Sequence, residues 1–123
     1  MNDYVTREKS RRLLKREQIE KLIQSGRPVY AWGIGREFLY LYESAGLKSC
    51  RLAGLIDANP FKQASCTVHG NKISSAEDIL PGASSDSVLL ITAVAHTDAI
   101  EASAKTIGFK GEIVDFRERK TYE

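Results

Sequence analysis

Two glycines and one aspartate are the residues whose types and spacing could do chemistry in this 123-residue chain. Gly33 and Gly35 lie in the stretch VYAWGIGREF, residues 29–38, where an apolar run ends and a charged pair follows. This pattern is typical of a buried strand that leads through a glycine-rich turn into a helix. Gly33 would allow the tight turn. Gly35 would let backbone N–H groups approach a phosphate, which the positive end of the helix also favours.

Asp57 is the second half of the signal, because it directly follows the apolar run LAGLI at residues 52–56. An acidic residue after the second strand accepts hydrogen bonds from a ribose diol. It would also repel a 2′-phosphate, so the pattern favours NAD-like over NADP-like ligands. Arg36, in the first turn of the helix, could add a charge-assisted contact to a phosphate.

Phe38 departs from the standard dinucleotide fingerprint, which has a third glycine at this position. A phenylalanine would hold the helix and the strand apart or turn outward, so the path of a pyrophosphate would differ. The alternative interpretation is structural. The two glycines would then only make a tight turn, and Asp57 would only end a strand before Asn59 and Pro60, with no ligand bound.

The run SVLLIT at residues 87–92 is typical of a central parallel strand that is buried on both faces. Residues just after it should therefore reach the same sheet edge as the glycine loop. His96 would need a carboxylate partner to act as a base, and the alternative is that residues 95–98 cap the next helix. The predicted ligand site comprises Gly33, Ile34, Gly35, Arg36, Asp57, Ala93 and His96. No catalytic or metal-ligating residue is predicted, and Cys50 and Cys66 are expected to be free thiols.

Helices and strands are expected to alternate along the chain. The patterns predict strands at residues 29–32, 52–56, 87–92 and 112–116, and helices at residues 7–24, 36–45, 75–80 and 97–107. Residues 61–73 are expected to be irregular, with a short strand ending near Ile73 as an option. The predicted fold class is α/β: a Rossmann-like, doubly wound parallel sheet of about four to five strands, with right-handed crossovers and an added N-terminal helix.

The basic charge is concentrated in an N-terminal helical extension, residues 1–27, with a balance of +4, while residues 28–123 form the Rossmann-like domain with −2. Glu17 and Glu20 are interleaved with the cations of this extension, which is typical of a solvated face. Its sparse apolar stripe favours packing on the sheet or pairing in a homodimer over binding nucleic acid. No apolar run is long enough for a membrane span or a signal peptide, so a cytoplasmic location is expected.

The order of motifs resembles small Rossmann domains linked to sugar and polysaccharide biosynthesis. The residues that carry the resemblance are Gly33 and Gly35, Asp57 with Asn59 and Pro60, Gly70 with Ile73, and Ser75 with Asp78. Such domains occur at the N-termini of sugar O-acyltransferases and of nucleotide-sugar dehydratases, and they accompany C-methyltransferases and FkbM-type methyltransferases. The resemblance covers about residues 28–116. It implies a domain that holds a nucleotide-sugar while another domain does the chemistry.

Two functions follow from these patterns. The first is a stand-alone Rossmann-like module that binds a nucleotide such as NAD, or a nucleotide-sugar. It would be accessory to glycan or secondary-metabolite assembly and could work beside a separate catalytic subunit. The alternative is a non-enzymatic interaction module that dimerises or docks a partner through its N-terminal helix. A complete dehydrogenase is not favoured, because no substrate domain supplies an acid or base. A methyltransferase is not favoured either, because Ala31 and Trp32 stand where an acidic residue usually precedes such a glycine loop, and because the chain is short.

Overall fold

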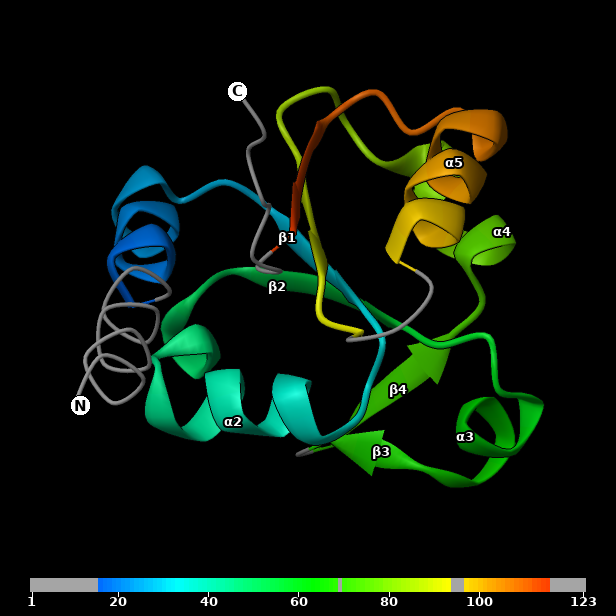
Figure 1. Cartoon of the computed structure of the whole chain (residues 1–123), viewed down its shortest axis with the longest axis horizontal. Coiled ribbons are helices and arrows are strands. Elements are labelled where there is room, and N and C mark those ends of the chain that lie inside the picture. The colour runs from blue at the N-terminus through cyan, green and yellow to red at the C-terminus, as the bar shows by residue number, and fades with distance from the viewer. Residues whose placement is uncertain (1–15, 69, 94–96, 116–123) are drawn as a thin grey trace, which may run out of the picture.

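Six strands form one sheet, and the order of its strands reverses at the middle. The structure is a computed structural model that describes residues 16–68, 70–93 and 97–115. Its strands are β1 (Val29–Trp32), β2 (Leu52–Ile56), β3 (Thr67–Val68), β4 (Asn71–Ser74), β5 (Val88–Ile91) and β6 (Glu112–Asp115). Its helices are residues 16–25, α2 (Arg36–Ser44), α3 (Pro60–Ser65), α4 (Ala76–Ile79) and α5 (Thr97–Ile107), with 3₁₀ turns η1 (Leu47–Ser49) and η2 (Leu80–Gly82). The order across the sheet is β3-β4-β2-β1-β5-β6 (Figure 1).

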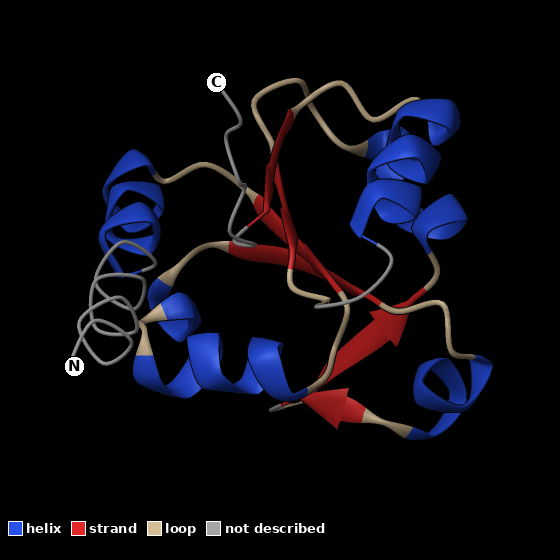
Figure 2. Ribbon diagram, in the orientation of Figure 1, coloured by secondary structure: helices blue, strands red, loops and turns tan. Residues whose placement is uncertain are grey.

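Helices cover both faces of the sheet, so the protein has three layers (Figure 2). On one face, Val29 and Ala31 of β1 pack in a cluster with Phe38 and Leu41 of α2. On the other face, Trp32 belongs to a cluster that also takes residues from α4, η2 and α5. Because side chains of a strand alternate between the two faces, β1 contributes to both clusters. All four residues of β5 are buried, as expected for a strand covered on both sides.

The expectation of four to five parallel strands is corrected to six strands in a mixed sheet. β1 pairs in parallel with β2 and β5, β2 with β4, and β5 with β6, whereas β3 is antiparallel to β4. The five parallel strands therefore have the order β4-β2-β1-β5-β6. The added strand β3 belongs to a short hairpin at the sheet edge, around the positive-φ Gly70.

The prediction that residues 61–73 are irregular is wrong, because this segment contains most of α3, the strand β3 and most of β4. Asn59 caps α3 by accepting a hydrogen bond from the backbone nitrogen of Phe61 at 2.9 Å, and Pro60 takes the first helical position. Both are standard helix-start residues. The sequence of this segment shows no regularly spaced apolar residues, because α3 buries none of its residues and needs no apolar face. The predicted strand that ends near Ile73 is present as β4.

The N-terminal helix packs against the face of the sheet that α2 covers. Ile19 is fully buried in the cluster of β1 and α2, and Leu22 and Ile23 pack partly buried beside it. The thiol of Cys50 lies 3.9 Å from the carbonyl oxygen of Ile19. Burial raises the pKa of this thiol to about 11, as is typical of a cysteine that packs in a core. Residues 7–15 of the predicted helix lie outside the described part of the chain.

Replacing Ile19 by Ala should destabilise the whole domain, because the methyl groups removed come from a fully buried site. A loss of about 3 kcal/mol in the free energy of unfolding is expected. Urea denaturation measures it. Gln18→Ala is the matched control, since residue 18 is exposed on the same helical turn. Equal stability of the two variants would contradict the packing described for this helix.

Candidate functional site

The glycine loop follows β1 at the point where the strand order reverses. In open α/β sheets, ligands bind beyond the carboxyl ends of the strands at such a reversal. Gly33 has φ +109°, and a Cβ atom built on it would lie 2.6 Å from the backbone nitrogen of Ala93, just after β5. Both the backbone conformation and the space at this position therefore require glycine. The predicted site residues Gly33 and Ala93 are in direct proximity.

Thr92 fastens the same junction with its side chain. Its hydroxyl lies 2.7 Å from the carbonyl oxygen of Gly33 and 3.0 Å from that of Trp32, and its single hydrogen can be donated to either or shared between them. Its backbone nitrogen donates to the carbonyl oxygen of Trp32 at 2.9 Å. The side chain is buried, so these bonds satisfy a polar group that could not reach water. Thr92 is not among the predicted site residues. The signal that could have identified it is a hydroxyl residue at the carboxyl end of an otherwise apolar strand.

Asp57 lies beside the loop, as predicted, but its carboxylate already binds the backbone. One oxygen, Oδ2, accepts from the backbone nitrogen of Ile34 at 2.9 Å. The other, Oδ1, accepts from the backbone nitrogen of Asn59 at 2.9 Å, closing an Asx turn. Asp57 therefore holds the middle of the glycine loop in place and also starts the turn into α3.

Lys62 completes this arrangement from the first helical turns of α3. Its ammonium group donates to the carbonyl oxygen of Ile34 at 2.6 Å and pairs with Oδ2 of Asp57 at 3.3 Å. Both polar groups of the Ile34 backbone are thus bound, one by the aspartate and one by the lysine. Lys62 is not among the predicted site residues. The signal that could have identified it is the helix start at Asn59 and Pro60, which brings Lys62 back toward the end of β2.

The charge of Asp57 is stabilised in the folded protein. Burial raises the pKa of this carboxyl group, but the backbone N–H groups of Asn59 and Ile34, together with Lys62, outweigh burial. Its pKa is therefore below the ordinary value of 3.8. The carboxylate is therefore ionised at neutral pH, the form that accepts the bonds from Ile34, Asn59 and Lys62.

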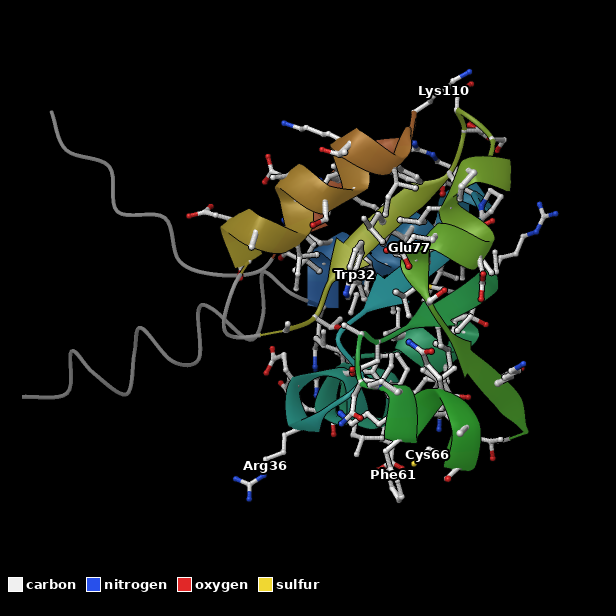
Figure 3. All side chains as sticks on the ribbon, turned by 90° about the vertical axis from the view of Figure 1, so that its right-hand side faces the viewer. Trp32, Arg36, Phe61, Cys66, Glu77 and Lys110 are labelled. Atoms are coloured by element: carbon white, nitrogen blue, oxygen red, sulfur yellow. The ribbon has the colours of Figure 1, made fainter. Side chains whose placement is uncertain are left out.

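Gly35 and Arg36 form the open side of the loop. A Cβ atom on Gly35 would meet nothing within 4 Å, so a ligand can approach the backbone here. Gly35 is the N-cap of α2 and supplies no side-chain cap, which leaves the positive end of the helix to other acceptors. Arg36 is exposed and extends into solvent in Figure 3. Both residues lie where an anion could reach them.

Phe38 does not turn outward. Its side chain is fully buried in the core between α2 and the sheet, and its ring lies 5.6 Å from that of Tyr42. The third glycine of the standard fingerprint lets the helix and strand pack closely, whereas here the ring fills that space. The phenylalanine therefore contributes packing to α2 and does not occlude the open side of the loop. The remaining predicted site residue, His96, lies outside the described residues.

An open hollow of about 350 Å³ borders the N-terminal helix at Arg16, Glu17, Glu20 and Lys21. A second cavity, of about 200 Å³, lies on β2 and β4 beside α4. It is lined by residues such as Gly54, Lys72, Ser74 and Ile79 and by none of the predicted site residues. Pockets for drug-sized ligands are usually larger, from about 300 Å³. Within the described ranges, no cluster of three or more His, Cys, Asp or Glu could hold a metal ion. No helix among those same residues has the length and apolar character to cross a membrane.

Comparison with models of protein families, with curated proteins and with solved structures found no match to this chain. The functional interpretation therefore depends on the contacts of the site itself.

Replacing Gly33 by Ala should destabilise the fold, because the new methyl group would collide with Ala93 and the backbone would be strained at positive φ. A loss of roughly 2–3 kcal/mol in the free energy of unfolding is expected. Gly35→Ala is the matched control two residues away, where the methyl group meets open space, and about 1 kcal/mol or less should be lost. A chemical denaturation series measures both. Equal losses would show that the junction is not tightly packed.

Asp57→Asn should lower stability at neutral pH, and the difference from the wild type should shrink in acid. The folded-state pKa is depressed, so the stabilisation is present above the unfolded value of 3.8 and is lost as pH falls through the folded value. Urea unfolding between about pH 6 and pH 2.5 measures this difference. Asp86→Asn, at a side chain 75% exposed, is the control and should show little effect at any pH. A difference that stays constant in acid would contradict the bonding of Asp57.

Proposed function

We propose that this protein is a Rossmann-like module that binds a nucleotide or a nucleotide-sugar at the loop formed by residues 33–36. The observation that carries the proposal is the strand order. Its five parallel strands run β4-β2-β1-β5-β6. This is the order of the first five strands in a dinucleotide-binding sheet, in which the glycine loop follows the central first strand. The glycine loop of this chain follows β1, next to the point of reversal.

The groups around the loop suit a phosphate-bearing ligand. Gly35 leaves open space at the start of α2, where backbone N–H groups and the helix dipole favour an anion. Arg36 adds a cation that is free to turn toward a phosphate. Asp57 and Lys62 stand at the end of β2, where the ribose of a nucleotide lies in sheets of this order. The phosphate would thus be bound at Gly35 and Arg36, and the ribose would be bound beside it at Asp57 and Lys62.

The module is proposed to bind rather than to catalyse, because the groups brought together are backbone amides, one aspartate and two cations. Their chemistry recognises charge and hydroxyl groups and supplies no acid–base pair for turnover. An accessory role in sugar, polysaccharide or secondary-metabolite assembly agrees with the motif order from Gly33 to Asp78. The ligand would be a nucleotide, for which the sequence pattern favours NAD or a nucleotide-sugar. A separate catalytic subunit would then act on the molecule held here.

Docking through the N-terminal helix is the second candidate, and the packing favours it less. Ile19 is fully buried against the chain's own β1 and α2, so this part of the apolar stripe is not available to a second copy. Among the described residues, Leu39 and Phe61 are the large hydrophobic side chains that are exposed and could meet a second copy.

A thermal unfolding series with NAD⁺, NADP⁺, UDP-, GDP- and dTDP-sugars, acetyl-CoA and S-adenosylmethionine tests the proposal. A ligand at a hundred times its Kd should stabilise the protein by about 2.7 kcal/mol. For a domain of this size, this raises the Tm by roughly ten degrees. Gly35→Trp should abolish the shift without unfolding the protein, since the site around Gly35 is open.

Gly82→Trp is the matched control, because Gly82 also has nothing within 4 Å of a new Cβ atom and lies in η2. It should keep the ligand-induced shift. If no ligand moves the Tm, or if Gly35→Trp leaves the shift intact, the glycine loop is not the binding site.

A further inference from the structure

The carboxylate of Asp57 has too few free acceptor positions to hold a ribose diol. A carboxylate offers about four lone-pair positions. Three are taken by bonds from the described part of the chain: Ile34 and Lys62 on Oδ2, and Asn59 on Oδ1. One position on Oδ1 remains. Binding both hydroxyls of a ribose diol requires two acceptor positions on the carboxylate. An unphosphorylated ribose would therefore have to displace one of the bonds that hold the glycine loop.

Lys62 offers the complementary group. Its ammonium has three N–H donors, and two are used, on Ile34 and Asp57. The side chain is 33% exposed, against 15% for Asp57, so the third donor can reach a bound ligand. An anion there would form a charge-assisted hydrogen bond, which is stronger than a bond between neutral groups.

The two charges also cancel at the end of β2. Asp57 alone would repel a phosphate on the ribose, which is why the sequence favours NAD-like ligands. With Lys62 at 3.3 Å the pair is neutral overall, and the repulsion is offset. What remains is one acceptor and one cationic donor side by side.

We propose, on the basis of the nucleotide-binding function above, that this site selects a ribose that carries one free hydroxyl next to a phosphate. The hydroxyl donates to the remaining position on Asp57 Oδ1, and the phosphate accepts from Lys62. Lys62 is then the residue that determines specificity. The chemical class includes nucleotides with a 2′-phosphate, as in NADP⁺, and those with a 3′-phosphate, as in coenzyme A.

Calorimetric titration of the full chain with three small probes tests the inference. The probes are AMP, adenosine 2′,5′-bisphosphate and adenosine 3′,5′-bisphosphate, with NAD⁺ and NADP⁺ as the larger pair. One of the two bisphosphates should bind about tenfold more tightly than AMP, and which one identifies the position of the phosphate. Lys62→Met should remove this preference, so that the ratio of the bisphosphate affinity to the AMP affinity falls to about one, and Lys62→Arg should retain it.

Lys105→Met is the matched control, because Lys105 is also an ion-paired lysine, at 3.2 Å from Glu101, and lies on α5. It should leave every affinity unchanged. A Tm measured for each variant checks that Lys62→Met is folded, and if it is not, the Lys62→Arg variant and the wild-type preference decide the question.

The outcomes separate the two proposals. If AMP or NAD⁺ binds at least as tightly as its phosphorylated counterpart, the inference about Lys62 is wrong and the nucleotide-binding function stands. The same holds if UDP-sugars bind and adenine nucleotides do not. If no nucleotide of either kind binds, both proposals fail.

Discussion

The two halves of the sheet meet where the chain leaves β1 and β5, and there is no room at that point for a side chain on residue 33. Gly33 and the backbone of Ala93 approach so closely that a Cβ atom would lie 2.6 Å away. Thr92 bridges the same two segments with hydrogen bonds to Trp32 and Gly33. The close approach fixes the start of the loop, and so it fixes where α2 begins.

Asp57 extends that constraint to the outer half of the sheet. Its carboxylate binds the loop at Ile34 and the start of α3 at Asn59, so the end of β2, the glycine loop and α3 share one partly buried charge. Lys62 returns from α3 to the same loop residue and balances the charge. The groups that hold the loop are thus the groups that would meet a ligand. A ligand that leaves these bonds intact would stabilise the site further. A ligand that displaces them would lose part of its binding free energy.

At the opposite end of the sheet, where the strands begin, the strands are joined by the contacts of an arginine. Arg27, just before β1, donates to the backbone oxygen of Asp86 at 2.8 Å and to the Glu112 carboxylate at 2.9 Å. It therefore ties together the amino ends of β1, β5 and β6. A surface ion pair alone contributes little to the stability of a fold. The hydrogen bond from Arg27 to the backbone oxygen of Asp86 also fixes the orientation of the guanidinium group. The amino edge is held by this contact, while the carboxyl edge leaves Gly35 and Arg36 open.

The sequence by itself determined the alternation of strands and helices, since apolar runs and glycine or proline breaks are local signals. It placed β1 and β2 at their observed residues, and it selected Gly33 and Asp57 as neighbours. It could not determine the segment after Asp57, because α3 is short and exposed and its start depends on side-chain caps at Asn59. Nor could it determine that Asp57 is largely occupied, or that Lys62 and Thr92 reach the loop. Those contacts join residues from different strands and helices, and only the tertiary structure brings them within hydrogen-bonding distance.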